Sequence, residues 1–469
     1  MDETASGNEI AGPETDARIR RTAQRLVTLL DEDGPGGLQI AITSLRPADI
    51  GAALGAMDPK ARLQVFIAMP PELAGEVLEE LRPELRDELL GDSDDSHLAQ
   101  ILAEADADDA VYFLDHLDDD RAAKLLAGLD EKLRGQLSEQ YELPEETAGR
   151  IMSRDIITLR SFLTGAQALA HVQTQYHEGN HHFSTLYVVD AESRLVGVLP
   201  FRQLVFAPPR ACLTTIMDRD VMSVSPETDR EAVARLMQKY HLLTIPVVDA
   251  ERRIRGMVTW DDAVDVLEAE AEEDLMAIAG TAESSEDNDS LWKRAWLRMP
   301  WLVITAIGGF INAKVISGYG ASLNTQMLLV GFMPLVGAMG GNIGLQCSTV
   351  TVRGLATGAI VPGRMLASIG REIGTGMLLA FAMALFCGLG GSFIAWSNGE
   401  NAALGAIMAT SLLLAVMLAA ALGVLIPLGC TRLKIDPAIA AGPFITMLND
   451  VSGYVIYITT VNVLLRAFA

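Results

Sequence analysis

Closely spaced cysteines are missing from this chain of 469 residues. Its four cysteines are Cys212, Cys347, Cys387 and Cys430, and three of them lie in apolar runs. A disulfide framework or a structural zinc site needs paired spacings, so the sequence argues against both. A glycine-rich loop of the Walker type is also missing, which argues against a pump driven directly by ATP. There is no nucleophile–base constellation either, so we expect no enzymatic activity.

Positive charge is scarce in the first part of the chain. The formal net charge is −25, yet from Leu291 onward ten Lys and Arg residues stand against four acids, so the preceding part carries −31. An acidic surface repels nucleic-acid phosphates and attracts cations, which excludes a nucleic-acid partner and favours divalent cations. The first residues, 1–17, are acidic and polar without a basic segment or an apolar core. We expect a disordered N-terminus and no cleavable signal peptide there.

Long apolar runs are confined to residues 291–469. Five of them are long enough to cross about 30 Å of hydrocarbon. They are Trp296–Ile316, Met327–Val352, Gly374–Trp396, Ala402–Leu428 and Ile439–Leu464. The sequence therefore predicts a mainly α membrane protein with five transmembrane helices.

The charges that flank these runs predict their orientation. The basic residues on one side are Lys293, Arg294, Arg298, Arg353, Arg364, Arg371, Arg432 and Lys434. The other side carries mainly Lys314, Glu400 and Arg466. Because basic loops stay in the cytoplasm, we expect the N-terminal half to be cytoplasmic and the C-terminus to lie outside the cell membrane.

Two kinds of internal repeat divide the soluble part. Met69–Leu81 aligns with Leu117–Leu129, a period of 48 residues, and both segments carry Leu at helical spacing behind Pro or Asp. Residues 18–145 are therefore expected to form a helical solenoid. In residues 146–259, Leu186–Val198 matches Ile245–Met257, each reading as strand, Asp turn, strand and then helix. This duplication resembles a tandem pair of CBS domains, some of which bind adenine nucleotides, so ATP at this pair stays open.

Residues 260–290 form an acidic connector before the first apolar run. No Lys or Arg occurs between Arg255 and Lys293, and eight acids fall within one predicted helix. Like charges at i,i+4 spacing, as at Asp261 and Asp265, destabilise a helix, and divalent cations would offset that repulsion. A solvated acidic linker is the alternative. A second acidic run around Glu104 and Asp108 favours a cation sensor built from hard oxygen ligands.

Two polar patches interrupt the apolar runs. Asp450 lies in the middle of the last run, where an ionisable side chain usually faces water or a partner. Gly340–Thr349 combines glycines with Asn342 and Gln346, which permits a broken helix beside an aqueous path. The alternatives are an Asp450 hydrogen bond to a neighbouring helix and close packing of small residues. Since Mg²⁺ is commonly held by one or two carboxylates and its own waters, two Asp450 side chains across a two-fold axis would make a site. We therefore expect a homodimer.

Together these features resemble the MgtE family of Mg²⁺ channels and transporters over nearly the whole chain. The order of domains is the same, and the family's glycine-rich and last-span motifs are present. The motif residues are Gly340, Gly341, Asn342, Gly344, Gln346, Asp436, Pro437, Ala438, Pro443, Asn449, Asp450 and Gly453. Leu345, Cys347 and His241 depart from residues common in the family.

The resemblance implies Mg²⁺ as both the transported and the regulatory ion. The implied pore residues are Asp450, Asn449, Gly341, Asn342, Gly344, Gln346 and Thr349. The implied regulatory metal ligands are Glu104, Asp108, Asp229, Glu231, Asp262, Asp265, Glu270 and Glu273. Internal Mg²⁺ would bridge the soluble domains and the connector and close the gate.

Two other functions stay open at this point. One is a secondary transporter that exchanges Mg²⁺ or Co²⁺ for Na⁺ or H⁺, in which Asp450 carries the proton. The other is a membrane receptor that transports nothing, in which the CBS pair reads nucleotide levels.

Overall fold

The computed structural model describes residues 13–178, 184–279, 291–318, 327–357, 360, 365–433, 435–438 and 442–468. The chain divides into two compact units, Met1–Glu268 and Ala269–Ala469. Of the expected disordered N-terminus, residues 1–17, the first twelve lie outside the described residues, whereas 13–17 are helical and so depart from the prediction. Of the expected connector, residues 260–290, the part after Ala279 lies outside the described residues.

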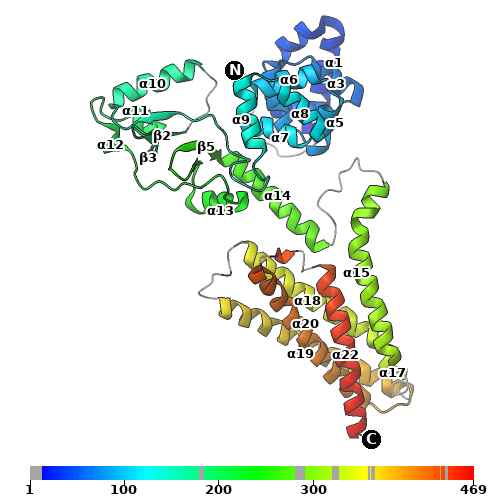
Figure 1. Cartoon of the computed structure of the whole chain (residues 1–469). Helices are drawn as coiled ribbons and strands as arrows, with labels where there is room; N and C mark the ends of the chain where they lie inside the picture. The colour runs from blue at the N-terminus through cyan, green and yellow to red at the C-terminus, as the bar shows by residue number, and fades with distance from the viewer. Residues whose placement is uncertain are drawn as a thin grey trace, which may run out of the picture. The chain divides into compact units, whose positions relative to one another are not determined.

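Short helices make up the first part of the soluble unit (Figure 1). A long helix, α1 (Pro13–Ile42), is broken at Gly34, whose φ of 68° suits glycine. The helices that follow are α2 (Pro47–Gly55), α3 (Pro59–Ile67), α4 (Pro71–Glu79), α5 (Pro83–Asp92), α6 (Asp95–Glu104), α7 (Ala107–Asp115), α8 (Asp119–Gly128) and α9 (Glu131–Tyr141). From α2 to α9 the helix starts are 12 residues apart, so the 48-residue repeat in the sequence is four shorter units.

The regular spacing has a local cause at each helix start. The helices α2 to α5 begin with proline, whose fixed φ suits the first turn. Asp58, Asp94 and Asp130 precede α3, α6 and α9, and each side chain accepts a hydrogen bond from a backbone N–H of the first turn. Most of these helices pack against the next but one, as α2 does on α4 and α6 on α8, which gives the expected solenoid.

The second part of the soluble unit contains the two CBS repeats. The first holds β1 (Thr158–Arg160), α10 (Gly165–Glu178), β2 (Thr185–Val189), β3 (Leu195–Pro200) and α11 (Phe201–Val205). After α12 (Leu213–Ile216), the second holds α13 (Arg230–Tyr240), β4 (Thr244–Val248) and β5 (Ile254–Thr259). In each repeat two antiparallel strands form a hairpin around the Asp turn, as the sequence predicts. The Tyr187 hydroxyl donates to Thr244 Oγ1 at 2.9 Å and joins the repeats.

Buried polar contacts join the solenoid to the CBS repeats. Arg150 forms an ion pair with Asp115 of α7, and Gln140 of α9 donates to the Met152 carbonyl at 2.8 Å. Arg150 and Gln140 are almost fully buried, so these contacts hold the two domains together as one unit. Helix α14 (Trp260–Ala279) then leaves the second repeat and carries the eight acids expected of the connector.

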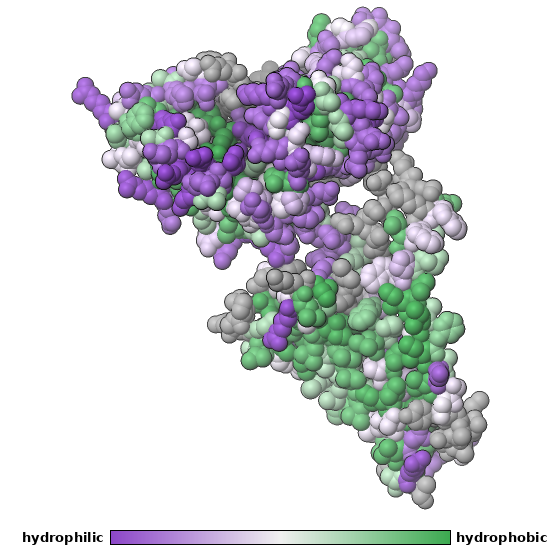
Figure 2. Space-filling model, viewed as in Figure 1, coloured by the Kyte–Doolittle hydropathy of each residue, from purple (hydrophilic) through white to green (hydrophobic). Residues whose placement is uncertain are grey.

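The membrane unit contains five helices long and apolar enough to span a bilayer. They are α15 (Leu291–Gly318), α18 (Met333–Ala356, preceded by α17, Met327–Gly331), α19 (Met365–Ser397), α20 (Ala403–Leu433) and α22 (Pro443–Phe468). Figure 2 shows a mostly hydrophobic surface on this unit and a mostly hydrophilic one on the soluble unit. The prediction of five transmembrane helices is confirmed. The third helix begins nine residues before the apolar run, so Arg371 lies within α19 rather than in a loop.

The broken helix that the glycines of the second span would permit is not observed, and the alternative of close packing is. Helix α18 is continuous through Gly340–Thr349, and its glycines instead allow close approach between helices. A Cβ atom placed on Gly423 of α20 would lie 2.3 Å from the Gly344 carbonyl oxygen. Backbone contact of this kind holds α18 and α20 together, as small residues commonly do in membranes.

Candidate metal sites

A strongly acidic cavity lies within the soluble unit. It has a volume of about 640 Å³, and ten carboxyl groups from the solenoid, the CBS repeats and the start of α14 line it. They are Glu72, Glu76, Glu79, Glu104, Asp106, Asp108, Asp109, Asp155, Asp261 and Asp262. No lysine or arginine is among the described residues that line it. The described lining of this cavity therefore concentrates acidic side chains.

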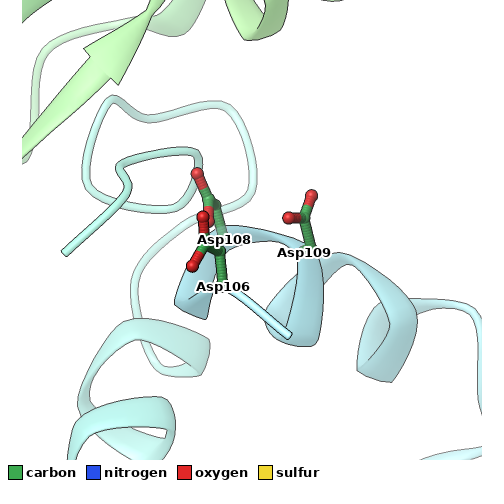
Figure 3. A group of neighbouring side chains, drawn as sticks. All are labelled: Asp106, Asp108 and Asp109. Carbon is green, nitrogen blue, oxygen red and sulfur yellow. The ribbon is translucent and has the colours of Figure 1, made fainter. Parts of the chain in front are cut away.

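Three of these carboxylates form a compact group at the start of α7. Ligand oxygens of Asp106, Asp108 and Asp109 lie within 4.8 Å of one another, and Figure 3 shows all three side chains on the same side of the helix start. One carboxylate oxygen of Asp108 is buried and has no hydrogen-bond partner in the described part of the chain. Hard oxygen donors at this spacing suit Mg²⁺ or Ca²⁺.

Burial and mutual repulsion raise the pKa of several carboxyls in this cavity. Burial is the main cause at Asp109, whose pKa rises to about 10, and the charge of Asp108 adds to it. Protonated Asp109 donates a hydrogen bond to Glu79, whose own pKa rises to about 7, chiefly through burial. Burial also raises the pKa of Asp262 to about 6, although the Thr259 hydroxyl donates to it. Without a metal ion, protons neutralise part of this charge.

The structure brings together some of the predicted regulatory residues and leaves others apart. Glu104, Asp108 and Asp262 all line the acidic cavity. Asp229 instead accepts a hydrogen bond from the Ala232 N–H at the start of α13, and Glu231 pairs with Arg235. Neither of these two acids lines the cavity, so their role as metal ligands stays a prediction.

The remaining predicted ligands lie along α14. Asp265 follows Asp262 by one turn but is not in the cavity lining, and burial raises its pKa. Glu270 and Glu273 belong to the other unit, beyond Glu268. Regulatory roles for all three stay predictions.

Several acids of the cavity were not among the predicted ligands. Glu72, Glu76 and Glu79 come from α4, about 30 residues before α7, and Asp155 comes from the CBS region. The 12-residue spacing of the helix starts is the sequence feature that could have identified the acids of α4. It stacks the start of α7 beside the helices before it, and so brings these acids towards Asp108.

A second, smaller cavity lies between α18 and α22 in the membrane unit. Its volume is about 430 Å³, and it is lined by three of the residues expected at the pore, Asp450, Asn342 and Gly341. Thr446 and Tyr454 of α22 line it as well. Among the described residues the Asp450 carboxylate has no hydrogen bond to a neighbouring helix. The two polar patches of the sequence thus meet in one place, and their single carboxylate is free to hold an ion.

Asn449 points away from this cavity. Its side chain is 1% exposed, and a Cβ atom on Gly344 would lie 1.9 Å from its amide nitrogen. Consecutive residues of a helix point about 100° apart, so Asp450 faces the cavity while Asn449 packs between α18 and α20. Asn449 and Gly344 do not line the cavity, so their expected role at the pore stays a prediction. Gln346 and Thr349 continue the exposed face of α18 beyond Asn342 without lining the cavity.

The far end of α14 packs within the membrane unit. Ala277 and Ile278 contact Val352 of α18 and Ala438, which precedes α22. The Ile278 carbonyl oxygen would lie 2.6 Å from a Cβ atom on Gly442. The last turn of α14 therefore packs against the segment that begins the last span.

Family sequence profiles match three parts of the chain. The MgtE intracellular N domain matches residues 45–146, and CBS domains match residues 148–209 and 213–269. The MgtE profile, described as a divalent cation transporter, matches residues 333–460. The magnesium transporter MgtE of Thermus thermophilus is 32% identical over 342 residues, which are 72% of this chain and 74% of that protein.

The chain belongs to the MgtE family of divalent cation transporters. The magnesium transporter MgtE of Bacillus subtilis is 33% identical over 314 residues, 67% of this chain and 68% of that protein. A crystal structure of the soluble part of a magnesium transporter is 27% identical, with a TM-score of 0.50, and the match covers 54% of this chain and 99% of that one. The MgtE family predicted from the motifs is confirmed, and so is the fold class. The chain is a multi-pass membrane protein of a family of magnesium transporters.

Proposed function

We propose that this chain is a homodimeric Mg²⁺ channel that passes hydrated Mg²⁺ beside Asp450 and closes when cytoplasmic Mg²⁺ fills the acidic cavity. The observation that carries the proposal is the pair of cavities. One is lined by ten carboxyls with no Lys or Arg among the described lining residues, and the other has a single carboxylate within a membrane span. The first is suited to sensing an ion and the second to conducting it.

The conducting site follows from the hydration of Mg²⁺. This ion gives up its waters reluctantly and binds through a few carboxylates while it keeps most of its shell. A single Asp450 is a weak selector, whereas two related by a two-fold axis would offer two charged acceptors. Asn342 and Gln346 are polar and exposed on α18, and polar groups that face lipid are costly. A partner protomer or a water-filled path beside this face removes that cost.

The closing step follows from the two ends of α14. Asp262, near the start of α14, lines the acidic cavity. Ile278, near the end of α14, contacts Gly442, which directly precedes α22. A divalent ion that neutralises the cavity would hold the start of α14 in place, and its far end would then hold the membrane helices. When Mg²⁺ is low, repulsion among the carboxyls favours release of α14.

The orientation follows from charge. The basic ends of the spans support a cytoplasmic soluble unit, in which the cavity would sense internal Mg²⁺ and the C-terminus would lie outside. Nucleotide binding by the CBS pair stays a prediction, which titration of ATP in the same flux assay would test.

Mg²⁺ flux in vesicles that contain the purified full chain tests the proposal. We expect uptake that falls as the internal Mg²⁺ concentration rises and that is unchanged when Na⁺ and H⁺ gradients are collapsed. Uptake that stops when either gradient is collapsed would support coupled exchange in place of a channel. Metal flux that persists in Asp450→Ala would contradict the conducting site.

A further inference from the structure

Two tyrosines on α22, Tyr454 and Tyr457, have opposite environments. Tyr457 is fully buried, and its hydroxyl donates to the Leu329 carbonyl oxygen of α17 at 3.0 Å. Tyr454 is partly exposed and lines the membrane cavity beside Asp450. Within the described chain, no hydrogen-bond partner is recorded for the Tyr454 hydroxyl. One phenol therefore holds helices together, and the other presents its oxygen to the cavity.

The Tyr454 hydroxyl and the Asp450 carboxylate meet at one point of the cavity wall. Tyr454 follows Asp450 by four residues, so the two side chains lie on the same face of α22. A Cβ atom placed on Gly337 of α18 would lie 2.7 Å from the Tyr454 hydroxyl and 3.4 Å from Asp450 Oδ1. The two oxygens are therefore no more than about 6 Å apart. Gly337 is the position on α18 that leaves room for both of them.

The chemistry of a hydrated cation gives this hydroxyl a role. Waters bound to Mg²⁺ point their hydrogens outward, so the wall of a site that takes the hydrated ion must offer acceptor oxygens. Asp450 supplies the charge, but one carboxylate cannot reach all sides of an octahedral shell. The phenolic oxygen of Tyr454 can accept a hydrogen bond as well as donate one. Ca²⁺ tolerates irregular coordination and exchanges its waters for protein oxygens more readily.

We propose that Tyr454 is a specificity-determining residue for ion passage. Its hydroxyl accepts a hydrogen bond from a water of the hydrated Mg²⁺ that Asp450 holds, and it thereby favours an ion that keeps its shell. This inference rests on the proposed conducting role of Asp450. It adds a neutral acceptor that acts on selectivity and leaves the charge of the site unchanged.

Tyr454→Phe removes the hydroxyl and keeps the ring, so the packing of α22 is preserved. Vesicles that contain the full-length variant are loaded with a fluorescent indicator, and Mg²⁺ and Ca²⁺ uptake are measured in parallel. We expect the ratio of Mg²⁺ to Ca²⁺ uptake to fall by about threefold to tenfold, the effect of one net hydrogen bond. Gly337→Ala, which crowds the hydroxyl, should shift the ratio in the same direction.

Tyr457→Phe is the matched control on the same helix. It removes a hydroxyl that bonds within the protein, so it should lower thermal stability and leave the uptake ratio unchanged. An unchanged ratio in Tyr454→Phe, with uptake lost in Asp450→Asn, would overturn the role of Tyr454 and leave the conducting site intact. Normal Mg²⁺ uptake in Asp450→Asn would overturn the conducting site and this inference with it.

Discussion

The two cavities of this protein differ in the number of carboxyl groups that line them. The soluble unit gathers ten carboxyls around about 640 Å³, whereas the membrane unit places one carboxylate beside about 430 Å³. In the soluble unit, bound protons and mobile cations can offset the repulsion between carboxylates. The raised pKa values of Asp109 and Glu79 mean that these two groups hold their protons to higher pH than usual. Within a bilayer each additional charge costs a few kcal/mol. In the proposed conducting site, the ion's own waters and neutral protein oxygens would therefore supply the remaining contacts.

The largest effect is expected at the single charge of the membrane cavity. Asp450→Asn should lower Mg²⁺ uptake by about 100-fold or more, because a hydrogen bond to a charged acceptor contributes about 1.5–3 kcal/mol in each protomer. Radiotracer or indicator uptake in vesicles measures this. Glu400→Gln, an exposed acid after α19, is the control and should leave uptake unchanged. Equal losses in both variants would mean that the position of the charge is unimportant.

The next effect tests the packing behind Asp450. Gly344→Ala would place a methyl group 1.9 Å from the Asn449 amide nitrogen, and overpacking of this kind costs about 1–3 kcal/mol. Thermal unfolding of the detergent-solubilised chain should show the loss. Gly390→Ala, where nothing lies within 4 Å, should be neutral or slightly stabilising. The double variant Gly344→Ala, Asn449→Ala should recover most of the stability, and failure to do so would contradict the inward orientation of Asn449.

A smaller effect is expected in the acidic cavity, where several neighbouring carboxyls can each bind the ion. Replacing Asp108 and Asp262 together with asparagine should shift channel closure to internal Mg²⁺ concentrations higher by about tenfold, equivalent to 1.4 kcal/mol of lost ion binding. Flux against internal Mg²⁺ gives the closure curve. Glu231→Gln, which lies outside the cavity lining, should shift the curve less. A larger shift from Glu231→Gln would contradict the proposal that this cavity senses the ion.

The smallest effect is a pH dependence confined to the soluble unit. Folding raises the pKa of Asp262 to about 6 and of Glu79 to about 7, above their values in the unfolded chain. The folded state therefore binds more protons, and its stability falls as the pH rises from about 4 to 7. Metal-free protein should resist urea better at pH 5 than at pH 8, and Mg²⁺ should reduce the difference. Trp260 lines the cavity, and its fluorescence reports the unfolding when the other four tryptophans are replaced by phenylalanine. Greater stability at pH 8 than at pH 5 would contradict the raised pKa values.

Much of the fold was predictable because it is encoded locally. Pro at helix starts, Leu at helical spacing and runs of apolar residues act within one element, so they are legible without the tertiary structure. The 48-residue repeat is visible in the sequence, but its 12-residue unit is not. The shorter unit is hidden because the helix starts differ: Pro begins α2 to α5, whereas Asp precedes α6 to α9. At Gly340–Thr349 the sequence left a broken helix and close packing open, because glycine in a membrane helix serves either, and the structure shows close packing.

The sites were predictable to a lesser degree. The sequence by itself determined the five spans, the two kinds of repeat, and the isolated carboxylate at Asp450, because length, periodicity and the cost of a charge in lipid act on single segments. Only the tertiary structure decided that Glu79 meets Asp109, that Asn449 turns inward against Gly344, and that Tyr454 shares a cavity with Asp450. These depend on the rotation of each helix about its axis and on which helices pack together, and both are set by the sum of many weak contacts between distant residues.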